Sequence, residues 1–238
     1  MGFSRGPSIV TDGLVLALDA ANTKSYPGSG NTWYDLSGNS NTGTLTNGPT
    51  FDSGNQGSIV FDGIDDYVNG PATNSVIGDN RASITLSAWV KITGTGAAYL
   101  FNCKRTSSQS TLVGLTANYN ASGAGSPGFL GALVRTYDDS VHKWYAYDGN
   151  YDNDGIWHNV VFTATGTTNT LYIDGISRST DDLGMQTVSG NTGTITVGSF
   201  GSSSWTNGNI ACVKLYTRDL SADEVLQNYN ATKGRFGL

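Results

Sequence analysis

The sequence predicts an all-β protein built around one hydrophobic core. Its 238 residues include 32 glycines, and only 13% of the residues are charged, so glycine has about twice its usual share and charge about half. Glu224 is the single glutamate among 19 acidic residues. Glycine and aspartate favour turns whereas glutamate favours helices, so the composition indicates strands joined by turns. A chain of this length can bury one β-domain core without disulfide bonds.

Alternation of apolar and polar residues places the strands. In residues 83–92, every second side chain from Ile84 to Ile92 is apolar, which is typical of a strand in a β sandwich. Similar segments predict ten further strands. They cover residues 14–19, 58–61, 97–102, 111–117, 128–136, 143–148, 157–165, 170–173, 194–198 and 210–216.

Turn and helix signals lie between and after these segments. Asp-Gly and Asn-Gly pairs predict tight turns, and the clearest, Asp174-Gly175, predicts a hairpin through residues 171–178. Ser221 and Glu224 have the spacing of a capping box, which predicts a helix that reaches about Asn228. This pattern gives Glu224 a structural role.

We expect one folded domain over residues 11–231. Residues 1–10 and 232–238 carry glycine and basic residues without periodicity, which predicts an N-terminal arm and a C-terminal tail. Cys103 and Cys212 lie in strand-like segments and are expected to be buried free thiols, with a disulfide between them as the alternative.

Charge and hydropathy exclude several partners. The net charge of −6 and the pI near 4.6 oppose binding to nucleic acid, which requires clustered lysine and arginine. No apolar run approaches the roughly 18 residues of a membrane span, and the start of the chain lacks the apolar segment of a signal peptide. We therefore expect neither nucleic acid nor a membrane as partner, and a product that stays in the cytoplasm where it is made.

Four blocks of sequence span most of the chain. They are residues 58–68 with Phe61-Asp62-Gly63, residues 84–90, residues 155–162 leading into 171–175, and residues 208–224. In order and spacing they resemble the concanavalin A-like lectin/glucanase superfamily, in its laminin-G-like and pentraxin-like branch. The resemblance implies a two-sheet antiparallel jelly-roll sandwich with one short C-terminal helix.

A narrower resemblance covers the start of the chain. Residues 9–22, 26–38 and 43–49 resemble the opening of laminin-G-like structural proteins of tailed bacteriophages. This implies a non-enzymatic virion protein, a decoration or adhesin-like domain on the head or on a tail fibre, with other virion proteins and further copies of itself as partners. The alternative is a calcium-dependent carbohydrate-binding module of a surface or secreted protein, with a host or surface glycan as partner.

The residue chemistry predicts no enzyme. Hydrolysis by a retaining glucanase needs two carboxyl groups; in that branch of the superfamily both are glutamates on one strand, and Glu224 stands alone. His142 and His158 lack the spacing of zinc ligands, and the chain has neither a nucleophile elbow nor a phosphate-binding loop. We therefore expect no catalytic residue and no required cofactor.

Calcium is the metal ion that the sequence favours, because it binds oxygen ligands from loops rich in aspartate. The resemblance makes Asp62 and Asp65 candidate ligands, with Asp19 of the first predicted strand as a third. Relatives commonly carry an acidic residue at the position of Ala211, which counts against the site. Turn formation by the aspartates is the alternative.

Aromatic residues gather within residues 137–152. Tyrosine and tryptophan side chains there are candidates for contact with a sugar or a protein: Tyr137, Trp144, Tyr145, Tyr147 and Tyr151. On a strand, Trp144 and Tyr145 point to opposite faces, so one set is expected in the core and the other at the surface. Trp33 and Tyr34 pose the same choice. Core packing, subunit contact and glycan binding stay open as alternatives for these residues.

Overall fold

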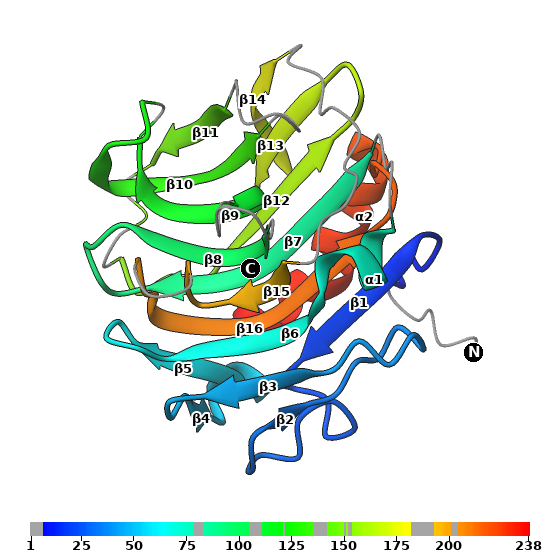
Figure 1. The fold of residues 1–238 in the computed structure, drawn as a ribbon, viewed down its shortest axis with the longest axis vertical. Helices are drawn as coiled ribbons and strands as arrows, with labels where there is room; N and C mark the ends of the chain where they lie inside the picture. Colours follow the sequence, from blue (N-terminus) through cyan, green and yellow to red (C-terminus); the bar gives the residue numbers. More distant parts are fainter. Residues whose placement is uncertain are drawn as a thin grey trace.

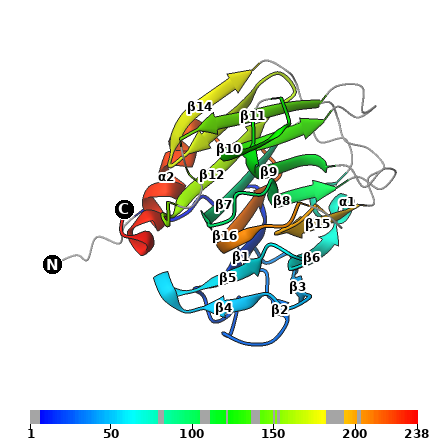
Figure 2. The ribbon, with the colours of Figure 1, turned by 90° about the vertical axis from the view of Figure 1, so that its left-hand side faces the viewer.

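A computed structural model describes residues 7–78, 83–104, 111–120, 122–135, 142–149, 151, 154–181, 193–200 and 204–238, without the side chains of residues 111, 135, 142, 148 and 181. Over these residues the chain forms two antiparallel β sheets packed face to face (Figures 1 and 2). Helix α2 (Ala222–Thr232) lies against the outer face of one sheet. The structure confirms the predicted β sandwich with its short C-terminal helix.

The first sheet, sheet A, has the order β14-β13-β12-β7-β16-β5-β4, and β1 also pairs with β16. Its strands are β1 (Leu14–Asp19), β4 (Thr50–Asp52), β5 (Ser58–Asp62), β7 (Ile84–Ile92), β12 (His158–Ala164), β13 (Asn169–Ile173), β14 (Ile176–Asp181) and β16 (Asn207–Tyr216). The predicted hairpin at Asp174-Gly175 is confirmed, since β13 and β14 pair on either side of it.

The second sheet, sheet B, has the order β11-β10-β9-β8-β15-β6-β3-β2. Its strands are β2 (Thr32–Trp33), β3 (Gly43–Thr46), β6 (Tyr67–Ala72), β8 (Ala98–Lys104), β9 (Thr111–Tyr119), β10 (Gly125–Arg135), β11 (His142–Asp148) and β15 (Thr194–Val197). Strands β2, β3 and β4 escaped prediction because two to four residues carry too little alternation, and β6 because Pro71 argues against a strand. Helix α1 (Thr73–Ile77) and the 3-10 turn η1 (Gly54–Gln56) were not predicted either.

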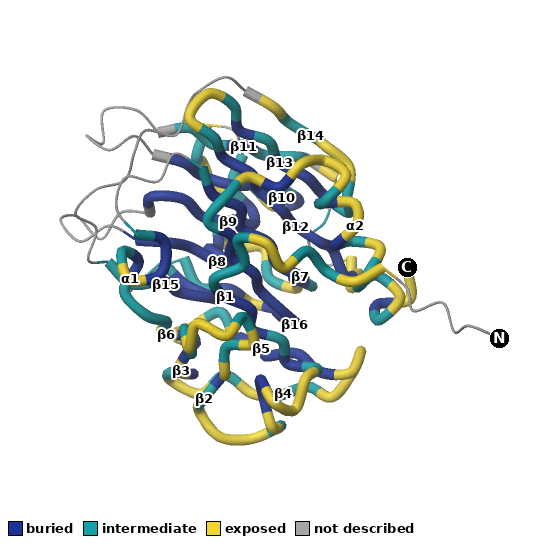
Figure 3. Tube along the Cα trace, turned by 90° about the vertical axis from the view of Figure 1, so that its right-hand side faces the viewer, coloured by how far each residue is buried: buried dark blue, intermediate teal, exposed yellow. Residues whose placement is uncertain are grey.

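The main core lies between the two sheets, where Figure 3 shows buried segments of both. In β7 the expected inward residues, such as Leu86 and Ala88, are fully buried. The alternate residues Thr85 and Trp89 are buried as well, because the C-terminal segment covers the outer face of sheet A. Cys103 and Cys212 are free and buried.

Helix α2 begins as predicted and ends later. The Ser221 side chain accepts from the Glu224 N–H at 3.3 Å, and the Glu224 carboxylate accepts from the Ser221 N–H at 2.9 Å, so the capping box is confirmed. Arg218 donates to both Glu224 oxygens, at 2.6 and 2.8 Å, and lowers the pKa of Glu224 to about 2. The helix continues past Asn228 to Thr232. No helix among the described residues is long and apolar enough to cross a membrane.

The structure differs from the tail expected at residues 232–238. The 3-10 turn η2 (Lys233–Phe236) returns to sheet A, where the Phe236 ring stacks on Trp89 with centres 4.1 Å apart and lies 4.9 Å from Trp157. Arg235 pairs with Asp19, with Nη1 and Oδ1 2.6 Å apart. The sequence of residues 232–238 does not predict that η2 packs on sheet A, because the residues that η2 contacts belong to distant parts of the chain.

Part of the expected N-terminal arm is docked too. The Ser8 carbonyl accepts from the Gln227 side chain at 2.8 Å, and the Val10 N–H donates to Asn228 at 2.7 Å. Residues 8–10 therefore lie against α2, while residues 1–6 fall outside the described residues.

Candidate functional site

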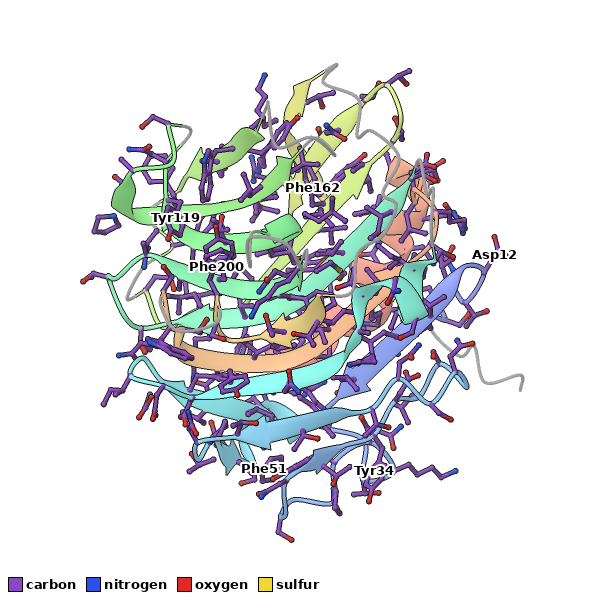
Figure 4. The ribbon with its side chains drawn as sticks, viewed as in Figure 1. Asp12, Tyr34, Phe51, Tyr119, Phe162 and Phe200 are labelled. Atoms are coloured by element: carbon purple, nitrogen blue, oxygen red, sulfur yellow. The ribbon has the colours of Figure 1, made fainter. Side chains whose placement is uncertain are left out.

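Four aromatic side chains form a continuous stack on the outer face of sheet B. Tyr119 of β9 stacks on Trp144 of β11 with ring centres 4.6 Å apart. Tyr99 of β8 meets Tyr119 edge-on at 5.6 Å and stacks on Phe200 at 4.7 Å. We call Tyr99, Tyr119, Trp144 and Phe200 the aromatic platform. Figure 4 shows Tyr119 and Phe200 at one side of the molecule, far from Tyr34.

The platform presents aromatic surface to solvent. Tyr119, Trp144 and Phe200 are half-buried, whereas Tyr99 is 4% exposed and supports them. None of the four belongs to the core between the sheets. The aromatic surface of the platform therefore contributes neither to the packing between the sheets nor to the contact with α2.

Two loops hold the platform in place. The Tyr119 hydroxyl lies 2.9 Å from the Ser204 hydroxyl, which ties β9 to the segment before β16. Gly123, in the turn between β9 and β10, has φ +78° and packs so closely on the Trp144 indole that any side chain there would collide with it. Glycine is required at this position both for its backbone conformation and for the close approach.

The other aromatic candidates divide as strand geometry predicts. Tyr145 is 2% exposed and belongs to the core, while its neighbour Trp144 lies on the opposite face. Trp33 is fully buried in the same core, so neither Tyr145 nor Trp33 can meet a ligand. Tyr34 is 49% exposed, but lies away from the platform (Figure 4). Tyr137 falls outside the described residues.

Tyr147 and Tyr151 lie where the edge strands of the two sheets, β11 and β14, approach each other. Their ring centres are 6.0 Å apart, and the guanidinium of Arg178 on β14 lies over Tyr147, 4.5 Å from the ring centre. We call Tyr147, Tyr151 and Arg178 the seam cluster. All three side chains are half-buried, so the seam is closed by side chains rather than by hydrogen-bonded strands.

Beside the seam, His158 is held between two carboxylates. Its Nδ1 lies 2.8 Å from Asp174 Oδ2 and its Nε2 lies 3.0 Å from Asp154 Oδ2. Because carboxylates only accept, the two contacts are both hydrogen bonds only when the imidazole carries a proton on each nitrogen. Burial lowers the pKa of His158, but the hydrogen bonds to Asp174 and Asp154 outweigh it and raise the pKa above its usual value. The three residues fasten the loop before β12 to the β13–β14 turn.

Three carboxylates converge in the turn between β5 and β6. One oxygen each of Asp62, Asp65 and Asp66 lie within 4.8 Å of one another. Asp62 and Asp65 are exposed and Asp66 is 4% exposed, and its burial together with the two neighbouring carboxylates raises the pKa of Asp66. An oxygen-only set with this charge suits a hard divalent cation, so the residues fit the Ca²⁺ that the fold family implies. Asp62 also accepts from the Ile64 N–H at 2.8 Å, the turn role that was the alternative.

Asp19 does not join this acidic turn. Asp62 pairs with Asn207 at one end of β16, whereas Asp19 pairs with Cys212 further along the strand and faces Arg235. Ala211 is buried beside the Trp89 cluster, so the residue at this position does not bear on a cation at Asp62. Asp66, which was not predicted as a ligand, is the third carboxylate of the group.

The acidic turn and the platform lie at the same end of the sandwich. Ser204 contacts Tyr119, Trp205 lies 6.1 Å from Tyr67, and Asn207 is the ladder partner of Asp62. One short segment therefore connects the stacked rings to the carboxylates.

The family known as Laminin_G_3, described as concanavalin A-like lectin/glucanases superfamily, matches residues 61–226. The match covers more than half of the chain and includes most of both sheets. The chain belongs to this family.

Solved structures of similar fold are found among the binding domains of toxins. The receptor-binding domain of botulinum neurotoxin C/D mosaic serotype has a TM-score of 0.70 at 15% identity, over 92% of this chain and 51% of that chain. The serotype D ligand-binding domain in complex with N-acetylneuraminic acid gives 0.70 at 15% identity, over 92% and 51%. The binding domain of Paraclostridial Mosquitocidal Protein 1 gives 0.67 at 16% identity, over 93% and 52%.

At these identities the likeness establishes the fold, and the chain spans about half the length of each neighbour. No curated protein matches the chain.

Within this laminin-G-like domain, sequence reasoning missed most of the platform. Tyr99, Tyr119 and Phe200 lie in three separate segments with no local clustering, and only Trp144 lies in the aromatic-rich stretch. The available signal was weak: Tyr99 lies within one predicted strand, residues 97–102, and Tyr119 lies just after another, residues 111–117.

A polar cleft of about 400 Å³ opens beside the C-terminal end of α2. Its lining includes Asp19, Gln56, Asn230, Thr232 and Arg235. The Arg235 guanidinium is fully engaged there, since it donates to Asp19, Asn55 and Gly57. The cleft thus marks the docking of η2 rather than a set of free binding groups.

Proposed function

We propose that this domain is a non-catalytic carbohydrate-binding module whose sugar lies on the aromatic platform. The observation that carries the proposal is the stack of half-exposed rings on the outer face of sheet B, which neither the core nor α2 uses. A pyranose ring presents a face of C–H groups that packs on an aromatic ring, while its hydroxyl groups bond to nearby polar groups. Asn120 and Ser122, in the turn beside the platform, supply such groups.

The acidic turn supports the same proposal. Asp62, Asp65 and Asp66 are the residues that would hold Ca²⁺, at the end of the sandwich where the platform lies. A bound Ca²⁺ supplies positive charge and free coordination positions for sugar hydroxyl groups. The three carboxylates themselves order the β5–β6 turn beside Trp205.

Similar structures lend further support. One neighbour is a receptor-binding domain, and another is a ligand-binding domain solved in complex with N-acetylneuraminic acid. A non-catalytic role also agrees with the place of Glu224, whose carboxylate is used by Arg218 and by the helix cap.

The proposal is tested with a glycan array, followed by calorimetric titration of the best ligand. Removal of a central aromatic contact commonly weakens binding by about tenfold or more, and we expect this for Trp144→Ala and for Tyr119→Ala. Tyr34→Ala removes a more exposed ring away from the platform and should bind as the wild type does. A glycan that binds the Trp144→Ala variant as tightly as the wild type would show that the sugar site is elsewhere. Thermal melts check that each variant is folded.

We further propose that the domain is displayed on a phage particle as a decoration or adhesin-like element that associates with virion proteins. Its support is the resemblance of residues 9–22, 26–38 and 43–49 to the opening of phage structural proteins. Mass spectrometry of purified particles tests this: the protein should co-purify with the virion at a fixed copy number. Its absence from intact particles would remove the virion role and leave glycan binding untouched.

A further inference from the structure

We propose that the seam cluster of Tyr147, Tyr151 and Arg178 binds the carboxylate of an acidic sugar. The inference rests on the proposed carbohydrate-binding function and adds to it a second contact that selects for charge. Its site differs from both the aromatic platform and the acidic turn, and it requires no metal ion.

Arg178 occupies an irregular position in the sheet. Ser177 pairs with Tyr172 and Ser179 pairs with Leu171, so Arg178 is an extra residue on β14 without a partner on β13. Such a β-bulge re-aims the side chain of the extra residue, and bulges recur where a strand serves a site. Here the bulge directs the guanidinium across the seam to Tyr147 on the other sheet.

The guanidinium of Arg178 is not neutralised by the described residues. No described carboxylate forms an ion pair with it, and its Nε is buried without a hydrogen-bond acceptor. Arg218 and Arg235 differ in this respect, since the first holds Glu224 through two bonds and the second holds Asp19. The uncompensated positive charge of Arg178 can therefore attract an anionic ligand, although the buried Nε itself is out of a ligand's reach.

The neighbouring carboxylates are committed elsewhere. Asp154 and Asp174 each direct one oxygen at His158, and their other oxygens accept from the N–H groups of Ile156 and Asn159 at 2.8 Å. They therefore do not compete for Arg178, and the protonated His158 offsets part of their charge.

The chemistry of the cluster selects the ligand. The guanidinium carbon of Arg178 lies over the Tyr147 ring, 4.5 Å from its centre, and a guanidinium carries a planar fork of N–H groups that matches the two oxygens of a carboxylate. Tyr151 lies 6.0 Å from Tyr147 and widens the aromatic surface beside the cation. A uronic or sialic acid residue combines the required carboxylate with a ring that can pack on tyrosine.

A matched pair of sugars provides the test. Methyl glucuronide and methyl glucoside differ only in having a carboxylate or a hydroxymethyl group at one carbon, and both are titrated into the full chain while backbone NMR signals are followed. We expect the glucuronide to bind about tenfold or more tightly than the glucoside, with the largest shifts at Tyr147, Tyr151 and Arg178. Arg178→Gln should abolish the difference and Arg178→Lys should reduce it.

Lys24→Gln removes the same charge from an exposed position away from the seam and should keep the preference. A wild type that binds the glucoside equally well overturns the seam site and leaves the platform standing, whereas absence of all sugar binding overturns both proposals. Inorganic sulfate that shifts the seam signals as strongly as the glucuronide overturns the assignment to a sugar. Thermal melts of the Arg178 variants separate a loss of binding from a loss of folding.

Discussion

Replacement of His158 by glutamine should remove the part of the pH dependence of the free energy of unfolding that comes from protonation of His158. In the wild type, His158 donates to Asp174 at 2.8 Å and to Asp154 at 3.0 Å, which requires the protonated ring. A glutamine amide resembles the neutral imidazole, because it presents one donor group and one acceptor. The variant therefore lacks the second charge-assisted hydrogen bond at every pH.

The expected magnitude follows from the burial of the partners. A hydrogen bond to a charged group contributes about 1.5–3 kcal/mol. The Asp154 and Asp174 side chains are 21% and 22% exposed, so water recovers part of the loss. We expect His158→Gln to lower the free energy of unfolding by about 2 kcal/mol at about pH 5.5, equivalent to about 4–8 °C in Tm for a domain of this size.

The raised pKa of His158 determines how its contribution to the free energy of unfolding changes with pH. Its contribution is complete below the unfolded-state pKa of about 6.5 and is lost as the pH rises through the higher folded-state value. As the pH rises from about 5.5 to about 8.5, the difference in stability between the wild type and the glutamine variant should narrow, because the ring loses its second donated bond when it loses its proton.

Urea unfolding at the two pH values measures the effect. His142→Gln, which replaces the other histidine of the chain, should retain the pH dependence of the wild type. A constant difference between the wild type and His158→Gln at both pH values would show that His158 has the same pKa in the folded and unfolded states, and would refute the doubly donating arrangement.

Three further predictions concern other parts of the molecule. Phe236→Ala should lower the free energy of unfolding by about 3 kcal/mol in chemical denaturation, because it removes a ring stacked on Trp89; an unchanged midpoint would mean that η2 is undocked in solution. Glu224→Gln should cost about 1–2 kcal/mol at neutral pH, since it weakens both the Arg218 pair and the helix cap, and this cost should fade as acid protonates Glu224 near its pKa of about 2. Calcium at a hundredfold excess over its Kd should stabilise the wild type by about 2.7 kcal/mol in a thermal melt, and Asp65→Asn should weaken this response; no calcium effect on the wild type would leave the acidic turn as a turn only.

The class of fold and several local structures can be predicted from short stretches of the sequence. The alternation in β7, the Asp174-Gly175 hairpin and the Ser221–Glu224 capping box all depend on residues within a few positions of one another. Such features follow from backbone geometry and short-range hydrogen bonds, so they can be recognised without knowledge of the rest of the chain. The opposite orientation of Trp144 and Tyr145 was foreseeable for the same reason.

Which surfaces are covered and which side chains meet could not be predicted before the strands were placed in space. The platform unites residues from β8, β9, β11 and the segment after β15, and the seam depends on a bulge that places Arg178 opposite a strand of the other sheet. Phe236 is likewise buried by Trp89, far away in the sequence. These contacts arise from strand order and sheet packing, which bring distant segments together. The local sequence of one segment does not indicate which other segment it will contact.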